Sequence, residues 1–498
     1  MQTPAPVSVG LVQINNRFSG QSYLPYTIGL LQAYAEQYAT DPGRYQFALP
    51  IYKRQHIERN LECLRGVDIA AFSAYVWNIN ISLATAHRLK EENPHCLIVF
   101  GGPQVPDRAG DFLQAHPFVD VAVHGPGEQT FLQLLEAWPD NDWSAIPGIS
   151  HLDSEGRLVA NEAGERLKDL SVIPSPYLSG TFDKLMAAMG GEETWIVLWE
   201  TNRGCPYSCT FCDWGSAIAS KIASFNMDRI RGEADWFSNN AIEFVFCCDA
   251  NFGILPRDID IVRYVAANKE RFGLPHALSV QNTKNATERA YLTQKILNDA
   301  GLNKGVTVSF QSLDKATLEM VKRDNISLDT YEELQRRFME DGVATYTDLI
   351  LGLPGETYQT YIEGIGHCIE NGQHNRIQFN NLSILPNSEM GSGEYQEKYG
   401  MVVVESRSVN FHGHLEKNDD GIYETQMLSV ATSSMPLEDW RRARAFSWMT
   451  AFLHFDKLLQ IPLLAAHRCA GTSFTALIDG FVNADEKHYP LLGEINGF

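Results

Sequence analysis

Apolar and polar positions alternate along the first 140 residues in blocks of regular length. Short apolar runs rich in β-branched residues have the length of buried strands, and the stretches between them have helical spacing. The strand-like runs are residues 7–14, 45–51, 67–72, 96–100 and 119–123, and the helix-like stretches are 26–38, 56–64, 80–92 and 128–138. This alternation predicts a parallel α/β sheet of doubly wound type, whose ligands bind beyond the carboxyl ends of the strands.

A second alternation begins at residue 195, after a hairpin pattern at 148–161 and a segment rich in Pro, Ser and Gly at 173–180. Its six strand-like runs are 195–199, 242–246, 278–281, 305–311, 344–351 and 376–384, and most lead into polar or glycine-rich loops. Six β/α units predict a partial (β/α)6 barrel of TIM type, with its active site at the carboxyl ends of the strands.

The repeat stops after residue 392, and residues 436–459 are strongly helical and rich in aromatic side chains. We therefore expect four regions: an N-terminal sheet domain (1–145), a hairpin and linker (146–190), the barrel (191–392) and a small, mostly helical C-terminal segment (393–498). The aromatic residues suit core packing, and the last segment is expected to cap a substrate.

Composition limits the classes of partner. The chain has 498 residues and a formal net charge of −21, which disfavours a nucleic-acid substrate. No signal peptide and no apolar run long enough to span a bilayer are expected. Nine cysteines without a secretory signal favour a cytoplasmic protein.

Three of the cysteines, Cys205, Cys209 and Cys212, lie close together on a loop directly after the strand-like run 195–199. Thiolates are the usual ligands of iron–sulfur clusters, and three of them leave one iron of a cubane open for a substrate. A zinc site would need a fourth ligand, disulfides would need an oxidising compartment, and a cluster of buried cysteines is the plain alternative. The other six are scattered and are expected to be small buried residues: Cys63, Cys96, Cys247, Cys248, Cys368 and Cys469.

The spacing Cys-x-x-x-Cys-x-x-Cys, with Phe211 between the second and third cysteines, resembles the cluster motif of the radical S-adenosylmethionine (SAM) enzymes. The resemblance spans about residues 195–390. In that family the open iron of a [4Fe-4S] cluster is chelated by SAM, and one electron cleaves SAM to a deoxyadenosyl radical. The resemblance therefore implies a [4Fe-4S] cluster and SAM as cofactors, and an electron donor such as flavodoxin or ferredoxin.

The same resemblance implies residues for each part of SAM. Beside Phe211, these are Asp249 for the ammonium group, Arg323 (with Lys322 second) for the carboxylate, Ser309 and Gln311 for the ribose, and Gly352 and Gly355 for the adenine. Each has a plainer alternative, such as a helix cap, a surface charge or an ordinary strand residue. Tyr207, Tyr346 and Asp348 are candidates for the substrate pocket, and no catalytic acid or base is assigned.

Glycine and polar residues near the strand ends of the first domain resemble the Rossmann-like cobalamin-binding domain that precedes many radical SAM cores. The residues that the resemblance implies for cobalamin are Leu24, Pro25, Ser73, Tyr75, Gly101, Gly102, Gln104, Gly125, Gly127 and Glu128. The Asp-x-His-x-x-Gly motif that supplies a cobalt ligand in other cobalamin domains is missing from residues 13–20, and the first histidine is His56. The alternative is a sheet of this type that binds nothing.

Together the resemblances imply a cobalamin-dependent radical SAM C-methyltransferase acting on an unactivated carbon of a small molecule or peptide. Ring rearrangement or oxidative cyclisation on the same architecture is the alternative chemistry. A regulatory protein that binds cobalamin or SAM without turnover is the alternative from another class. A transfer-RNA methylthiotransferase is disfavoured, because its N-terminal domain would need three more cluster cysteines.

Overall fold

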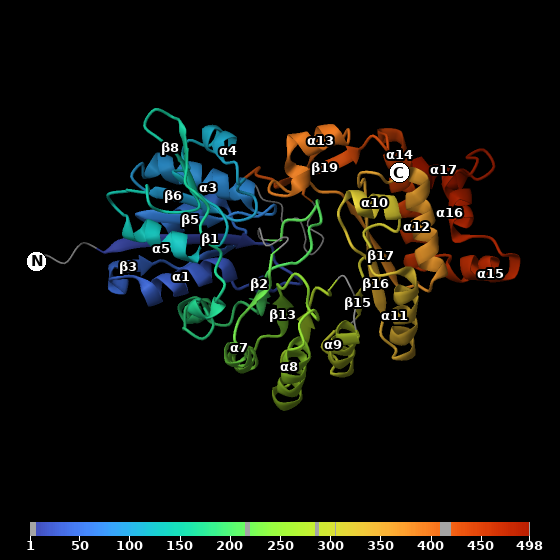
Figure 1. Ribbon diagram of the computed structural model, residues 1–498, viewed down its shortest axis with the longest axis horizontal. Helices are drawn as coiled ribbons and strands as arrows, with labels where there is room; N and C mark the ends of the chain where they lie inside the picture. The colour runs from blue at the N-terminus through green and yellow to red at the C-terminus, as the bar shows by residue number, and fades with distance from the viewer. Residues whose placement is uncertain (1–5, 215–219, 284–287, 304, 409–419, 498) are drawn as a thin grey trace, which may run out of the picture.

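The computed structural model describes residues 6–214, 220–283, 288–303, 305–408 and 420–497. Three regions follow one another along the chain in Figure 1: a sheet domain (blue to teal), a barrel-like domain (green to yellow) and a C-terminal region (orange to red). The α/β class with these two successive architectures is as predicted.

The first sheet has six parallel strands: β1 (Val7–Asn15), β3 (Tyr45–Phe47), β4 (Ile51–Lys53), β5 (Ile69–Ser73), β6 (Leu97–Gly101) and β7 (Val121–Val123). Strands β8 (Ile149–Leu152) and β9 (Leu158–Ala160) extend it antiparallel, in the order β3-β1-β5-β6-β7-β8-β9 with β4 beside β1, which confirms the predicted hairpin. Its helices are α1 (Tyr26–Tyr38), α2 (Ile57–Leu64), α3 (Ile79–Glu92), α4 (Gly110–Ala115) and α5 (Glu128–Glu136).

Apolar clusters cover both faces of this sheet, one including residues of α2 and α3 and the other residues of α1 and α5, as a doubly wound sheet requires. One expectation was wrong. Residues 45–51 form two short strands rather than one, and Pro50 lies in the break, where it has no backbone N–H to donate to a ladder.

The second domain contains the six predicted parallel strands, β10 (Trp195–Trp199), β13 (Phe244–Cys247), β14 (Ala277–Ser279), β15 (Val306–Thr307), β16 (Thr345–Leu351) and β17 (Arg376–Asn381). They form two hydrogen-bonded groups, β14-β13-β10 and β15-β16-β17. The helices between them are α7 (Met227–Asn239), α8 (Asp258–Phe272), α9 (Glu288–Asp299), α10 (Lys315–Met320), α11 (Leu328–Glu340) and α12 (Tyr358–Glu370).

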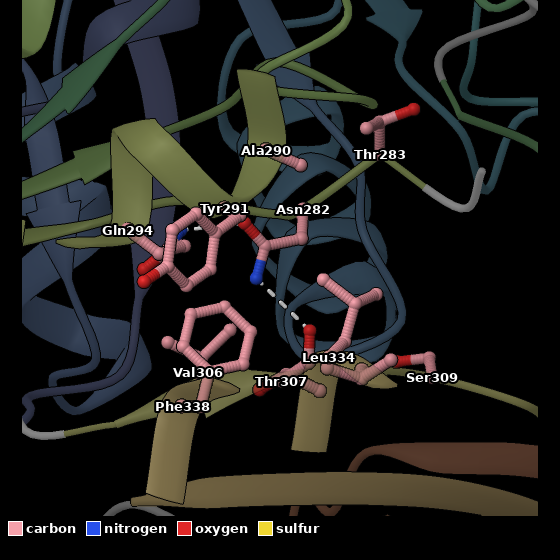
Figure 2. A pocket seen from close by; sticks show the side chains of 11 residues that line it. Asn282, Thr283, Ala290, Tyr291, Gln294, Val306, Thr307, Ser309, Leu334 and Phe338 are labelled. Atoms are coloured by element: carbon pink, nitrogen blue, oxygen red, sulfur yellow. Dashed lines mark hydrogen bonds between the residues drawn. The ribbon is translucent and has the colours of Figure 1, made fainter. Parts of the chain in front are cut away.

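The seam between β14 and β15 is bridged by a side chain, because Asn282 Nδ2 donates to the Thr307 carbonyl at 2.9 Å. Gln294 from α9 in turn donates to Asn282. Figure 2 shows these residues around a cavity of about 30 Å³. That volume is roughly one water molecule's share of liquid, so the cavity is too small for a cofactor or substrate.

The two domains share a strand that sequence reasoning missed. β2 (Ser22–Tyr23), from the loop after β1, pairs in parallel with β10 through Ser22↔Trp195 and Tyr23↔Ile196. Glu193, just before β10, accepts hydrogen bonds from Ser22 at 2.7 Å, Arg17 at 2.7 Å and Lys53 at 2.5 Å. The first sheet is thus attached directly to the edge of the barrel.

The C-terminal region contains α13 (Gly393–Lys398), a hairpin of β18 (Val402–Arg407) and β19 (Thr425–Ala431), α14 (Leu437–Thr450), a π-helical turn (Ala451–Phe455), α15 (Gln460–Ala470), α16 (Phe474–Val482) and α17 (Pro490–Gly497). Helix α14 packs on α12 and α16. Within the described ranges, no helix combines the length and the apolar character needed to cross a bilayer.

Candidate active site

The three-cysteine loop follows β10 at the carboxyl end of the barrel strands. Cys205 and Cys209 are each 3% exposed, and Cys212 is half-buried. Gly204 has φ +123°, and a Cβ there would lie 2.5 Å from the Lys221 carbonyl oxygen, so the turn into the loop requires glycine. The amide of Ser220 donates back to the Cys205 carbonyl at 2.8 Å.

Asp249 fixes the start of this loop. Its carboxylate accepts from the amides of Thr201 at 2.7 Å and Asn202 at 3.1 Å, from Asn202 Nδ2 at 2.7 Å, and from the Thr201 hydroxyl. Burial raises the pKa of Asp249 to about 7 against the effect of these bonds. The carboxylate is engaged within the chain, so the structure gives Asp249 a role in positioning the loop, and its role as acceptor for a ligand ammonium stays a prediction.

Thr210 lies between the second and third cysteines, and its hydrogen bonds fix the middle of the loop. Its amide donates to the Val321 carbonyl at 3.0 Å, and its carbonyl accepts from the Met390 amide at 3.0 Å. Its hydroxyl lies 3.1 Å from the Tyr395 hydroxyl. Phe211 packs on the apolar cluster that contains Val321 and Met390. Thr210 was not predicted, because its partners are more than 100 residues away.

Asn251 is a second residue that the sequence did not reveal. It is 1% exposed and donates from Nδ2 to Cys205 Sγ at 3.2 Å. Its Oδ1 is buried without a hydrogen-bond partner among the described residues. A signal was present, since Asn251 follows β13 two residues after Asp249, but polar residues after strands are common.

Arg323, the residue predicted for the SAM carboxylate, lies beside Cys209 and Cys212. It is 4% exposed and held by the carbonyls of Phe310 at 3.1 Å and Ser309 at 2.5 Å. Burial lowers the pKa of Arg323, while the Cys209 and Cys212 thiols oppose that effect. Lys322, the second choice, points away and pairs with Glu389 at 2.7 Å on the surface.

The barrel strands β15 and β16 contribute a polar group beside Arg323. Ser309 donates to Asp348 Oδ2 at 2.6 Å, and burial raises the pKa of Asp348. Gln311 has φ +67°, and its Oε1 is buried without a partner in the part of the chain that the structure describes. Tyr346, from the same side of β16 as Asp348, and Tyr207 from the cysteine loop are both half-buried.

Gly352 and Gly355 lie close to other parts of the chain. A Cβ on Gly352 would lie 3.3 Å from the Ser429 carbonyl oxygen, and one on Gly355 would lie 2.5 Å from Met320 Sδ. Both have positive φ, at +96° and +93°. These glycines allow close packing beside β19 and α10, and their approach to the adenine stays a prediction.

The predicted cobalamin residues fall at the carboxyl edge of the first sheet, where parallel neighbours β5, β6 and β7 end together. Gly102 has φ +104°, and a Cβ there would lie 2.7 Å from the Ala74 carbonyl oxygen. Tyr75 stacks on the half-exposed Trp77 at 4.5 Å and lies 2.9 Å from Thr27 Oγ1. The remaining members of this edge are Pro25, Ser73, Gly101, Gln104, Gly125 and Gly127.

Two of the predicted cobalamin residues have other partners. Leu24 is 0% exposed and packs in the core with Trp195 and Val197, so its side chain is a core residue. Glu128 is 4% exposed and pairs with Arg203 of the cysteine loop at 2.8 Å. Burial alone would raise the pKa of Glu128, but Arg203 lowers it.

A cavity of about 450 Å³ adjoins this edge, between α5, β8 and residues 160–167. Gly125 and Glu128 line it, together with His124, whose Nε2 lies 2.9 Å from Ser150 Oγ. Gly125 has φ +70° with no atom within 4 Å of a built Cβ, so the loop after β7 is open as well as sharply turned.

The carboxyl ends of the two sets of strands are joined to each other. Asn387, after β17, accepts from the Asp107 amide at 2.7 Å and donates to the Val105 carbonyl at 3.0 Å, both after β6. Glu424, before β19, accepts from the amides of Asn80 at 2.8 Å and Ile81 at 3.0 Å, at the start of α3. The predicted cobalamin edge and the cysteine loop therefore lie in neighbouring parts of one interface.

Comparison with known proteins agrees with this architecture. Residues 199–365 match the radical SAM superfamily, and residues 51–135 match the B12 binding domain. The chain is 38% identical over 466 residues to the cobalamin-dependent radical SAM methyltransferase TokK of Streptomyces tokunonensis, covering 92% of this chain and 67% of TokK. It is 37% identical over 468 residues to the 2-(S-pantetheinyl)-carbapenam-3-carboxylate methyltransferase of Streptantibioticus cattleyicolor, covering 93% of this chain and 68% of that protein.

Solved structures share the fold at low identity. The cobalamin-dependent SAM radical enzyme OxsB with aqua-cobalamin and SAM bound superposes with a TM-score of 0.65 at 14% identity, covering 99% of this chain and 75% of OxsB. The radical SAM methyltransferase TsrM from Kitasatospora setae, with cobalamin and a [4Fe-4S] cluster bound, gives 0.63 at 15% identity, covering 89% and 90%.

A radical SAM barrel joined to a B12-binding sheet defines the class of protein. Within that class, the chain belongs to the cobalamin-dependent radical SAM methyltransferases, although it spans only about two thirds of the length of its two relatives. The protein is therefore an enzyme that transfers a methyl group and uses a [4Fe-4S] cluster, SAM and cobalamin.

The residues present fit these groups. The buried oxygens of Asn251 and Gln311 have no partner among the described residues and can each accept a hydrogen bond from a ligand. Among those residues, no three His, Cys, Asp or Glu side chains converge on one metal ion. A cubane binds each thiolate to a different iron, so three thiolates on one loop can hold a cluster and leave its fourth iron open.

Proposed function

We propose that this enzyme methylates an unactivated carbon of a small molecule, and that its substrate is a carbapenam carboxylate with a thioether side chain. The family is shared with relatives of 37–38% identity, one of which is named for 2-(S-pantetheinyl)-carbapenam-3-carboxylate. An unactivated C–H bond is not acidic enough for a general base. The bound cofactors supply hydrogen-atom abstraction and the methyl group instead.

The observation that carries the proposal is the interface between the two strand edges. The loop with Cys205, Cys209 and Cys212 lies beside Arg323, and the predicted cobalamin edge meets that loop through Glu128 and Arg203. Methyl transfer to a substrate radical requires the two cofactors to face one another across the substrate. The alternative, ring rearrangement or oxidative cyclisation, uses the same architecture, so the mass of the product has to separate the two reactions.

We assign roles accordingly. Cys205, Cys209 and Cys212 hold the cluster, and Arg323 binds the carboxylate of SAM. Gln311 accepts a hydrogen bond from the ribose, with Ser309 oriented by Asp348 beside it. Gly125 leaves the loop after β7 open at the cobalamin edge, and Gly102 lets the loop after β6 pack closely on Ala74. In these roles the protein binds and orients, and no side chain has to move a proton.

Residues 393–498 are proposed to cap the substrate. Strand β19 lies antiparallel beside the residues that follow β17, since the Ile384 amide donates to the Met427 carbonyl at 2.8 Å. The same segment reaches the first sheet through Glu424. The C-terminal segment therefore borders both the carboxyl edge of the barrel strands and that of the first sheet. A flavodoxin or ferredoxin is proposed as the electron donor.

The test is to incubate the anaerobically reconstituted enzyme with reductant, methyl-deuterated SAM and 2-(S-pantetheinyl)-carbapenam-3-carboxylate. We expect deoxyadenosine, S-adenosylhomocysteine and a product that has gained one labelled methyl group. The Cys212→Ala variant, incubated in parallel, should give none of the three. Deoxyadenosine with a product of unchanged mass, or one lacking two hydrogens, would contradict methylation and favour the alternative chemistry.

A further inference from the structure

A buried ion pair joins the cysteine loop to the carboxyl edge of the first sheet. Arg203 NH2 lies 2.8 Å from Glu128 Oε1, with the side chains 18% and 4% exposed. Arg203 also donates from Nε at 3.0 Å and NH2 at 2.9 Å to Glu200, at the end of β10. The guanidinium is therefore held between a carboxylate of its own domain and one from the other domain.

The positions of the two residues in the chain give the pair its significance. Arg203 precedes Gly204 and Cys205, so it lies two residues from the first cysteine. Glu128 begins α5 directly after Gly127, in the loop that closes the first sheet's carboxyl edge after β7. A shift of either residue moves a loop assigned to one cofactor relative to the loop assigned to the other.

The surroundings leave the pair little freedom. The residues before Arg203 are fixed by Asp249, and the residue after it, Gly204, packs against the Lys221 backbone. Arg203 itself lies 5.9 Å above the Phe225 ring, and its strand β11 (Asn202–Arg203) pairs with β12 (Ala223–Ser224). A buried charge held on several sides loses its partner only at high cost, so the pair is a rigid link.

We propose that Glu128 and Arg203 are positioning residues that set the spacing between the cysteine loop and the cobalamin edge, and so couple radical formation to methyl transfer. This inference rests on the proposed function. Loss of the ion pair leaves each loop intact but allows the cysteine loop and the loop after β7 to move relative to one another. A misplacement of about 1 Å can lower a rate by roughly a hundredfold when reacting groups must meet. Cleavage of SAM needs only the barrel side and should therefore suffer less.

The chain offers a matched control. Gln21 Nε2 donates to Glu243 Oε2 at 2.9 Å and likewise joins a loop of the first domain to the barrel, but just before β13, at the opposite end of the strands from the cysteines. Glu128→Gln and Glu243→Gln make the same change at two contacts between the domains. Only the first should alter the spacing at the site.

The first measurement needs no cofactor. Amide hydrogen exchange of the protein without cluster or cobalamin should become faster in Glu128→Gln at residues 125–130 and 200–206 together, and stay unchanged there in Glu243→Gln. At residues 125–130 the double variant Glu128→Gln, Arg203→Gln should exchange no faster than Glu128→Gln alone, because the link between the two loops is already lost in the single variant. Unchanged exchange at 200–206 in Glu128→Gln overturns the proposal.

The second measurement is the yield of methylated product per deoxyadenosine in the loaded enzyme. Glu128→Gln should lower this ratio by roughly tenfold or more while iron and cobalt contents stay at the wild-type level. A ratio equal to that of the wild type overturns the coupling role. If the wild-type enzyme itself forms no methylated product, the proposed function fails instead, and the exchange experiment still decides whether the pair links the two loops.

Discussion

The cysteine loop and the carboxyl edge of the first sheet border the same site but are built by opposite means. The loop is held by side chains from distant elements: Asp249, Thr210 and Asn251 each fix a different part of it. The sheet edge depends on glycines instead: Gly102 lets its loop pack on the Ala74 backbone, and Gly125 leaves the loop after β7 open. Three thiolates must hold one rigid cluster, whereas a broad flat cofactor needs open backbone, and each construction suits its cofactor.

The largest expected effect tests the loop alone. Cys212→Ala should abolish iron binding and lower deoxyadenosine formation by at least about 1,000-fold, because two thiolates cannot hold the cubane. Iron and sulfide analysis and the visible spectrum check this. Cys63→Ala removes an exposed thiol remote from the site and should keep both iron binding and deoxyadenosine formation. Iron retained at the wild-type level in Cys212→Ala would count against the cluster assignment.

Gly102→Ala tests the sheet edge. Its Cβ would lie 2.7 Å from the Ala74 oxygen at φ +104°, so the loop must move. We expect cobalt content to fall severalfold while iron is retained, with a stability loss of about 1–3 kcal/mol. Gly20→Ala is the control, because it has φ +82° but no atom within 4 Å of the new Cβ. Equal loss of cobalt in both would show that backbone strain alone, rather than position at the edge, is responsible.

Asp249→Asn separates loop positioning from stability. The asparagine amide has only one acceptor oxygen, and its NH2 group would face N–H donors of Thr201 and Asn202. We expect this to lower the free energy of unfolding by about 1–3 kcal/mol. Asp258→Asn makes the same change at a buried carboxylate that accepts from the amides of Gly253 and Leu255. We expect similar losses of thermal stability, but loss of iron only in Asp249→Asn. Iron loss in neither would contradict the anchoring role.

The contact between sheet and barrel should depend on pH. Burial would raise the pKa of Glu193, but hydrogen bonds from Lys53, Ser22 and Arg17 lower it to about 2, below its ordinary 4.5. An acid whose folded pKa is depressed stabilises the fold above its unfolded pKa, and that stability is lost as pH falls from about 4.5 toward 2. Denaturant unfolding at several pH values should show Glu193→Gln to be less stable near pH 6, with the difference shrinking below pH 4.5.

The smallest effect concerns the residue next to Arg323. Lys322→Ala removes an exposed pair with Glu389 and should change stability by less than about 0.5 kcal/mol. The KM for SAM should stay within about twofold of the wild type in Lys322→Ala, whereas Arg323→Lys should raise it severalfold, because a compact ammonium cannot reproduce the planar, two-pronged geometry of a guanidinium. Equal KM values for the two variants would remove Arg323 from the SAM site.

Local patterning predicted much of this protein. The alternation of apolar runs predicted both sheets, and the cysteine spacing predicted the metal loop. These signals are short in range, because strand periodicity and ligand spacing are properties of a few neighbouring residues. Arg323 was assigned to SAM from the family resemblance, and that assignment stays a prediction. Local patterning does not decide between several chemically reasonable uses of one residue. Asp249 could bind a ligand or a backbone turn, and the sequence does not say which donors lie nearby.

What the sequence by itself determined is the set of elements and the chemistry that the cysteine loop can support. Only the tertiary structure decided how the two domains meet: the shared strand β2, the link from Glu128 to Arg203, and the cap that Glu424 supplies to α3. The physical reason is that these contacts join residues up to several hundred positions apart, and a buried carboxylate takes whichever donor the packing of the whole chain brings to it.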